Sequence, residues 1–295
     1  MPQFWNGKVQ VPERKDEHLP MQLKNAVSFL ALAAAAALAQ FPMTVSAQDV
    51  VAPRQHAPRK VYNGGNPRVI ENVTVEDSTN WSGYAVTGTS FTKALGSWVV
   101  PSVNCSVTPN TYSSFWVGTD GWTSSSVEQT GTDSDCNGSS PSYYAWYEFY
   151  PNPSYLISSV PVSPGNVISA QVTYSGSKFT ITLTNETTGK SYSKSATVRS
   201  AKRTSAEWIA EAPCCTNAGG ILPLSDFGTV DFGEDHTGVG STNDATASGV
   251  SGAISAFGGN VYESIMVNGT TGANESVPSS LSSDGSSFTA TWYSE

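Results

Sequence analysis

The stretch Lys178-Phe179-Thr180-Ile181-Thr182-Leu183-Thr184 alternates apolar and hydroxyl side chains. Successive side chains of a β-strand point to opposite faces of its sheet, so Phe179, Ile181 and Leu183 face a core while the threonines face solvent. A sheet with one apolar face needs a second layer to cover that face. This stretch therefore predicts an antiparallel sheet packed within a sandwich.

Segments of the same kind recur from residue 78 to residue 295. They are rich in β-branched and aromatic residues and are separated by clusters of Gly, Asn, Pro or Ser. No amphipathic helix of useful length interrupts them. We expect strands at residues 81–88, 95–100, 113–118, 143–150, 167–174, 178–184, 191–198, 205–211, 229–232, 261–267 and 286–293. The fold class predicted is all-β, a single β-sandwich of two antiparallel sheets in one domain, residues 78–295.

Residues 21–47 have the features of a signal peptide. They begin at Met21, where we expect translation to start, and continue through a lysine into the apolar run Ala26–Ala39. The segment closes on a small-x-small triplet that predicts cleavage after Ala47. The apolar run is shorter than the ~20 residues needed to span a bilayer. We therefore expect a secreted, extracellular protein with no membrane partner in its mature form.

Two other N-terminal segments lack a strand pattern. Residues 1–20 are polar and of mixed charge, which predicts an unstructured leader. Residues 48–77 combine prolines, a Gly-Gly pair and several cations without periodicity, which indicates a propeptide or linker. Residues 71–295 are acidic, with 7 Lys+Arg against 20 Asp+Glu and a formal charge of −13. A basic propeptide would cover an acidic cleft until it is removed, whereas a linker would have no inhibitory role.

The acidic body also restricts the partners. Nucleic acids and anionic membranes are bound by clustered cations, so neither is expected as a partner. Carboxylates that repel one another at neutral pH lose their charge in acid, so the composition suits a protein that works at low pH.

The segment Tyr143–Tyr150 departs from simple alternation because both of its faces are aromatic. One face can fill the core. The opposite face still carries Tyr144, Trp146, Glu148 and Tyr150. An aromatic wall that contains a carboxylate is typical of the floor of a binding cleft. The alternative is a surface covered by a loop or a partner subunit.

Most catalytic templates do not fit this chain. Beyond residue 77 the one histidine is His236, in a polar Gly-rich loop with no nucleophile motif, which indicates a surface histidine. No spaced set of His and Cys predicts a metal site, and no cofactor is expected. Acid–base chemistry by carboxylates and amides remains, with the candidates Glu211, Glu207, Glu148, Glu128, Asp120 and Asp133. Glu211 ends the strand 205–211, where a side chain is both rigidly held and accessible.

Seven blocks in order resemble the glutamic peptidases, or eqolisins, a family of secreted acid endopeptidases. They are Asn80-Trp81-Ser82-Gly83-Tyr84, Trp116-Val117-Gly118-Thr119-Asp120-Gly121, Gln129-Thr130-Gly131-Thr132-Asp133, Ala145-Trp146-Tyr147-Glu148-Phe149-Tyr150-Pro151, Asn185-Glu186-Thr187-Thr188-Gly189-Lys190, Ala206-Glu207-Trp208-Ile209-Ala210-Glu211 and Leu222-Pro223-Leu224-Ser225-Asp226-Phe227-Gly228. The resemblance covers residues 80–295. It implies a sandwich of two seven-stranded sheets and a monomer that acts on protein and peptide substrates.

The resemblance assigns catalysis to Gln129 and Glu211. A glutamate can take a proton from water and return it to the leaving amine. A glutamine amide does not titrate, so it can donate to a developing oxyanion even in acid. A histidine would be protonated there and could not serve as a base.

Further residues match the substrate cleft of the family: Trp81, Trp116, Asp120, Asp133, Trp146, Glu148 and Tyr150. Family members carry Glu-Asp where this chain has Glu211-Ala212, an Asp at Tyr144, and a Cys in the loop Gly121–Ser124, which is about one residue shorter here. We therefore expect altered subsites.

The four cysteines predict disulfides in an exported protein. Either Cys105 pairs with Cys136 and Cys214 with Cys215, or the links are crossed in one of two ways.

Two other functions fit the composition. A glycoside hydrolase would use two carboxylates and has no need of Gln129. A carbohydrate-binding or peptide-binding β-sandwich would explain an aromatic cleft but not a Gln/Glu pair.

Overall fold

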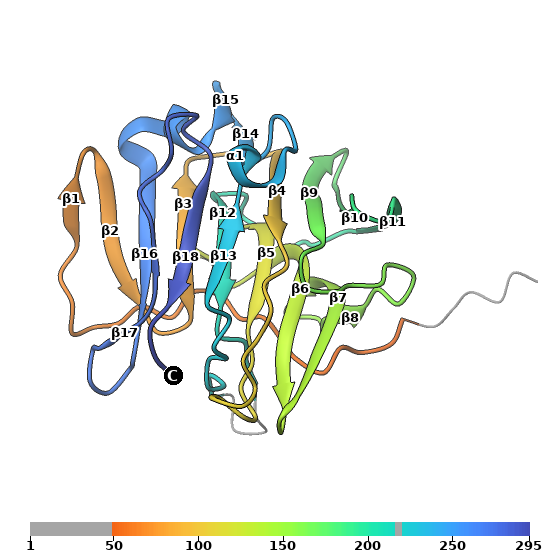
Figure 1. Cartoon of the computed structure of the whole chain (residues 1–295). Coiled ribbons are helices and arrows are strands. Elements are labelled where there is room, and N and C mark those ends of the chain that lie inside the picture. Colours follow the sequence, from red (N-terminus) through yellow and green to blue (C-terminus); the bar gives the residue numbers. More distant parts are fainter. Residues whose placement is uncertain (1–48, 216–219) are drawn as a thin grey trace, which may run out of the picture. The chain divides into compact units, whose positions relative to one another are not determined.

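Figure 1 shows a computed structural model of the protein, which describes residues 49–215 and 220–295. The expected leader and signal peptide, residues 1–47, lie outside the described residues. Among the residues that are described, no helix is both long and apolar enough to cross a membrane.

The regular secondary structure of the described chain is almost entirely strand, which confirms the all-β prediction. One short α-helix, α1 (Glu234–Thr237), and one 3-10 helix, η1 (Ile254–Asn260), are the helical elements found in these ranges. The strands are β1 (Arg68–Ile70), β2 (Val73–Ser78), β3 (Trp81–Thr87), β4 (Lys93–Val99), β5 (Ser114–Thr119), β6 (Val127–Asn137), β7 (Ser140–Tyr150), β8 (Tyr155–Leu156), β9 (Val167–Ser175), β10 (Lys178–Asn185), β11 (Lys190–Ala196), β12 (Ser205–Glu211), β13 (Thr229–Phe232), β14 (Asp244–Ala247), β15 (Val250–Ala253), β16 (Val261–Val267), β17 (Asn274–Pro278) and β18 (Phe288–Trp292).

These strands form two layers. The first layer has the order β1-β2-β16-β3-β12-β5-β6-β7-β8, in which only the pair β2 and β16 is parallel. The second runs β11-β10-β9-β4-β13-β18-β17, with the hairpin β14–β15 also paired to β4. Pairing of β16 with β17 joins the layers, so hydrogen bonds connect all the strands into one folded sheet. The predicted β-sandwich is confirmed.

The main core lies between the layers and is dominated by aromatic residues, including Trp98 on β4 and Trp208 on β12. Both indoles also hydrogen-bond across the layers: Trp98 Nε1 donates to Thr132 Oγ1 at 2.9 Å, and Trp208 Nε1 donates to the carbonyl of Leu95 at 2.5 Å. Fully burying side chains of this size stabilises the fold by about 2–3 kcal/mol each. The indole bonds fix how the layers lie on each other.

A second apolar cluster lies on the outer face of the first layer. Strand β12 shows how alternation separates the two clusters, because Ala206, Trp208 and Ala210 belong to the main core and Ile209 to the outer cluster. The outer cluster also contains Ala52, Trp81, Ala85, Trp116, Trp122, Val127 and Trp146. The two faces predicted for Tyr143–Tyr150 divide in the same way, since Ala145 joins the core and Trp146 the outer cluster.

Several strands were not predicted, and the longest is β6 (Val127–Asn137), which carries Gln129. Its sequence is mostly polar, so it lacks the run of apolar and aromatic residues that marks the other strands. Several shorter strands were also missed. Two of them, β1 and β2, occupy residues 68–78, at the end of the segment 48–77 where we expected a propeptide or linker without packed strands. The sequence of β2 mixes apolar and acidic residues, so alternation is weak, and it becomes a strand by pairing in parallel with β16. Strands β8, β14, β15 and β17 span five residues or fewer. Such short strands depend on neighbours that the local sequence does not contain.

The disulfides follow the uncrossed pattern. Cys105 bonds to Cys136 and ties the loop before β5 to the end of β6. Cys214 bonds to its neighbour Cys215, just after β12.

Candidate active site

Strand register gathers the polar candidates on the outer face of the first layer. Gln129 on β6 lies opposite Glu148 on β7, and Asp133 lies four residues along β6 on the same face. Glu211, at the end of β12, lies opposite Trp81 on β3. Because side chains on one face recur every second residue, these groups project to the same side as the outer cluster.

Trp116 links this group to Glu211. Its indole Nε1 donates to Glu211 Oε2 at 2.8 Å. Room for the ring depends on Gly131, where a Cβ atom would lie 2.4 Å from the carbonyl of Phe115 and 2.6 Å from the Trp116 Cβ. Glycine is therefore required beside the ring because a larger residue would collide with backbone.

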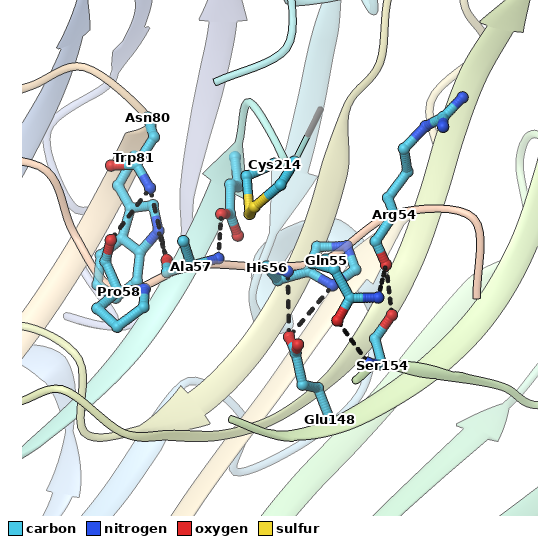
Figure 2. The surroundings of a disulfide bond; sticks show 12 residues. Arg54, Gln55, His56, Ala57, Pro58, Asn80, Trp81, Glu148, Ser154 and Cys214 are labelled. Atoms are coloured by element: carbon cyan, nitrogen blue, oxygen red, sulfur yellow. Dashed lines mark hydrogen bonds and ion pairs between the residues drawn. A yellow bond between two sulfur atoms is a disulfide. The ribbon is translucent and has the colours of Figure 1, made fainter. Parts of the chain in front are cut away.

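Residues 49–62 run across this face from the β8 side to the β2 side (Figure 1). Isolated bridges fix the segment at Val51 opposite Tyr155, at Gln55 opposite Cys214 and at Val61 opposite Ser78. In Figure 2 the chain from Arg54 to Pro58 is extended and passes between Cys214 and Glu148. The expected acidic cleft is therefore occupied by a part of the chain itself.

Two side chains hold one peptide bond of this segment. Gln129 Nε2 donates to the carbonyl oxygen of His56 at 2.9 Å, and the amide of Ala57 donates to Glu211 Oε1 at 3.1 Å. Glu148 Oε2 accepts from the amide of His56 at 3.1 Å and from Gln129 Nε2 at 2.9 Å. The C–N bond between His56 and Ala57 thus lies between the amide of Gln129 and the carboxyl of Glu211.

Neighbouring groups satisfy the remaining backbone of the segment. Cys214 and Gln55 exchange two backbone hydrogen bonds, each 2.8 Å long, and Trp81 Nε1 donates to the carbonyl of Ala57 at 3.1 Å. Main-chain recognition of this kind is how an extended peptide binds beside a sheet, largely independent of its sequence.

The side chain of His56 is fully buried in the cleft. Its ring stacks on Trp146, with centroids 3.5 Å apart and planes 5° from parallel, and its Nε2 lies 3.2 Å from Asp133 Oδ1. Burial disfavours the imidazolium, but the carboxylates of Asp133 and Glu148 outweigh burial and raise the pKa of His56 to about 10. A charged imidazolium therefore lies between two acids and an indole.

The two carboxyl groups next to the held peptide bond resist ionisation. Burial, opposed by the nearby His56 charge and reinforced by Glu148, raises the pKa of Glu211 to about 8. Burial also raises the pKa of Glu148, although hydrogen bonds with His56 act against this shift. Burial therefore disfavours the charged form of both acids while the segment covers them.

The structure brings together most of the residues that the sequence assigned to the site. Around the bound segment lie Gln129, Glu211, Trp81, Trp116, Asp133, Trp146 and Glu148. Tyr150 packs at the edge of the outer cluster and is half-buried. Asp120 has a different position: its carboxylate accepts the backbone amides of Lys202, Arg203 and Thr204, so it anchors a turn.

The other candidate acids lie away from the segment. Glu128 and Glu207 are buried near Asp120, and burial raises the pKa of each, to about 9 for Glu128 and well above the ordinary value for Glu207. His236 is exposed on α1, as expected of a surface histidine.

Sequence reasoning missed several residues of the site. These are His56 of the segment itself and the residues around its two arginines: Tyr112 and Asp135 at Arg54, and Glu76 and Trp122 at Arg59. The available signal was the contrast between a basic segment and an acidic body. That contrast predicted an attraction but not the contacts.

An acidic groove that binds an extended chain by its backbone defines a peptide-binding site, and comparison with known proteins gives the class. A profile of the Peptidase A4 family matches residues 79–289. Aspergillopepsin-2 of Aspergillus niger is 33% identical over 198 residues, which cover 58% of this chain and 70% of the relative. Scytalidopepsin B of Scytalidium lignicola is 34% identical over 166 residues, covering 53% of this chain and 61% of the relative.

Comparison with solved structures indicates the same family. A crystal structure of scytalido-glutamic peptidase with a transition state analog inhibitor matches with a TM-score of 0.60 and 27% identity, over 73% of this chain and 98% of the other. The chain belongs to the Peptidase A4 family and is a peptide hydrolase of the glutamic peptidase type.

Proposed function

We propose that this protein is a secreted acid endopeptidase in which Gln129 and Glu211 are the catalytic pair. The observation that carries the proposal is the held peptide bond, since Gln129 binds its carbonyl oxygen and Glu211 accepts from its nitrogen. Peptide hydrolysis needs one group at each of these two atoms.

The mechanism follows from the two contacts. Glu211 as a carboxylate takes a proton from water, whose oxygen attacks the carbonyl carbon of the substrate. Gln129 Nε2, already at the carbonyl oxygen, stabilises the oxyanion of the tetrahedral intermediate. Glu211 then returns the proton to the nitrogen, and the C–N bond breaks. The Trp116 N–H holds Glu211 in place for both transfers.

Acid conditions suit this pair. The amide of Gln129 keeps its N–H donors at any pH, whereas a histidine base would be lost to protonation. The pKa of about 8 belongs to Glu211 covered by the segment. Because burial is its largest cause, the entry of the attacking water beside the bound peptide lowers this pKa and favours the Glu211 carboxylate that takes the proton.

We also propose that the basic N-terminal region, residues 48–77, contains a propeptide and that the protein is exported. Occupation of the cleft by residues 54–58 supports the first point, and two disulfides support the second, because such bonds persist in oxidising compartments.

The test compares hydrolysis of a denatured protein at pH 2–5 by the wild type and by Glu211→Gln and Gln129→Ala. We expect Glu211→Gln to abolish turnover and Gln129→Ala to lower it by about 10² to 10³ or more. Glu207→Gln is the matched control, since Glu207 is a buried acid on the same face of the same strand. Full activity of Glu211→Gln, or loss of activity only in Glu207→Gln, would refute the assignment.

A further inference from the structure

The two arginines that flank the held peptide bond both rest on an aromatic ring and an acid. Arg54 precedes the bond: its Cζ lies 3.7 Å from the centroid of the Tyr112 ring, and its Nε lies 3.4 Å from Asp135 Oδ2. The side chain is only 19% exposed. A guanidinium is bound well by this combination of a π face and a carboxyl group.

Arg59 follows the bond and is bound more completely. Its Nη1 donates to Glu76 Oε2 at 2.6 Å, its Cζ lies 3.7 Å from the Trp122 ring centroid, and its side chain is 5% exposed. Trp122 is itself supported by Tyr262, with ring centroids 5.3 Å apart. The loop that carries Trp122 is one of the places where this chain differs from the glutamic peptidases that it resembles.

Building on the proposed function, we propose that residues 54–59 lie in the register of a substrate. The bond between His56 and Ala57 is the bond that the enzyme cleaves in its own chain. The cleft selects peptides with arginine or lysine at the third position on each side of the cleaved bond. Arg54 and Arg59 occupy these two positions.

The cleavage step balances without any further reactant. Water adds its oxygen to the carbonyl carbon of His56, and the C–N bond to Ala57 breaks. The nitrogen takes one proton by way of Glu211, so the products are a carboxyl group on His56 and an amine on Ala57. The hydrogen bonds from Gln129 and to Glu211 already lie on the two atoms that change.

The aromatic rings of Tyr112 and Trp122 allow the cleft to select cationic side chains at low pH as well. Burial and the neighbouring Asp133 raise the pKa of Asp135 to about 8, so this carboxyl is neutral at low pH. The attraction of a guanidinium for the Tyr112 and Trp122 rings does not titrate. Selection for cations therefore persists below the pKa of the carboxyl groups, carried by the aromatic faces.

The first experiment measures kcat/KM of the activated enzyme at pH 4 on the peptide Pro-Arg-Gln-His-Ala-Pro-Arg-Lys, which copies residues 53–60. Replacing the arginine that corresponds to Arg59 by alanine is expected to lower kcat/KM about tenfold, the combined effect of one ion pair and one cation–π contact. In the Trp122→Leu enzyme, the same change in the peptide should lower kcat/KM clearly less than tenfold. Should Trp122→Leu not fold, Glu76→Gln takes its place and should give the same result. Glu186→Gln, an exposed acid between β10 and β11, is the control and should give the wild-type ratio.

The second experiment expresses the 295-residue sequence in a secreting host and follows the secreted chain at pH 4. Intact mass at early times should show the first released fragment ending at His56 and the remaining chain beginning at Ala57, while the Glu211→Gln chain stays whole.

The outcomes separate the two proposals. If denatured protein is hydrolysed but first cleavage occurs elsewhere, the assignment of the His56–Ala57 bond is overturned. Equal kcat/KM for the arginine and alanine peptides overturns the selection for cations. If neither denatured protein nor any peptide is hydrolysed, the proposed function itself fails.

Discussion

Replacing Glu128 by glutamine should remove one contribution to the loss of stability of this fold as pH rises. Glu128 is buried beside Asp120; its Oε1 has no hydrogen-bond partner among the described residues, and its Oε2 accepts from Thr119 Oγ1 at 3.4 Å. Burial, with the charge of Asp120, raises its pKa from 4.5 to about 9. Between these values the native protein keeps a proton that the unfolded chain has lost. The free energy of unfolding therefore falls as pH rises through this window.

The size of the effect follows from linkage. One such proton lowers the free energy of unfolding by about 1.4 kcal/mol per pH unit, or about 3 kcal/mol between pH 5 and pH 7. A glutamine keeps the shape of the side chain and carries no charge at either pH, so Glu128→Gln should lose this contribution.

Urea unfolding followed by tryptophan fluorescence at pH 5, 6 and 7 measures the effect. Both proteins should carry Glu211→Gln to prevent self-digestion, which leaves the comparison matched. The variant should lose less stability than its parent over this range, by about 3 kcal/mol. Parallel pH profiles for the two proteins would show that Glu128 is ionised in the native state, and the reasoning from burial would be wrong.

Three other changes test the packing around the site. Trp116→Phe removes the N–H at Glu211 and should lower kcat about tenfold to hundredfold with little change in KM, measured by steady-state kinetics on a denatured protein. The double variant Cys105→Ala/Cys136→Ala should lose about 3 kcal/mol of stability, seen as a lower thermal midpoint, because the bond closes a loop across 31 positions; an unchanged midpoint would contradict this. Gly131→Ala places a Cβ 2.4 Å from a backbone oxygen and should abolish folding or activity, and a fully active, equally stable variant would refute the close approach.

The strand pattern made most of the fold predictable. Alternation in Lys178–Thr184 and in Tyr143–Tyr150 assigned side chains to faces correctly because the period of a strand is fixed by backbone geometry. The strand pattern missed β1, β2 and the longer β6, because these strands have mostly polar or weakly alternating sequences and are held by pairing, as β2 is by β16 and β6 by β5 and β7.

The candidate site was predictable only in part. The family resemblance selected Gln129 and Glu211, and register brings both onto the face where they meet one peptide bond. It also selected Asp120, which instead anchors the turn at residues 202–204. The sequence does not record whether a carboxylate accepts backbone amides or faces a cleft, because both are polar environments.

The sequence by itself determined that this is an all-β chain with an acidic body, a basic N-terminal segment and a match to the glutamic peptidases. These properties are local or compositional, so they can be read residue by residue. Only the tertiary structure decided that His56 lies buried between Asp133 and Glu148, and that the bond to Ala57 lies on Gln129 and Glu211. Those contacts join residues 73 to 154 positions apart, and such pairs meet only when the strands between them have packed.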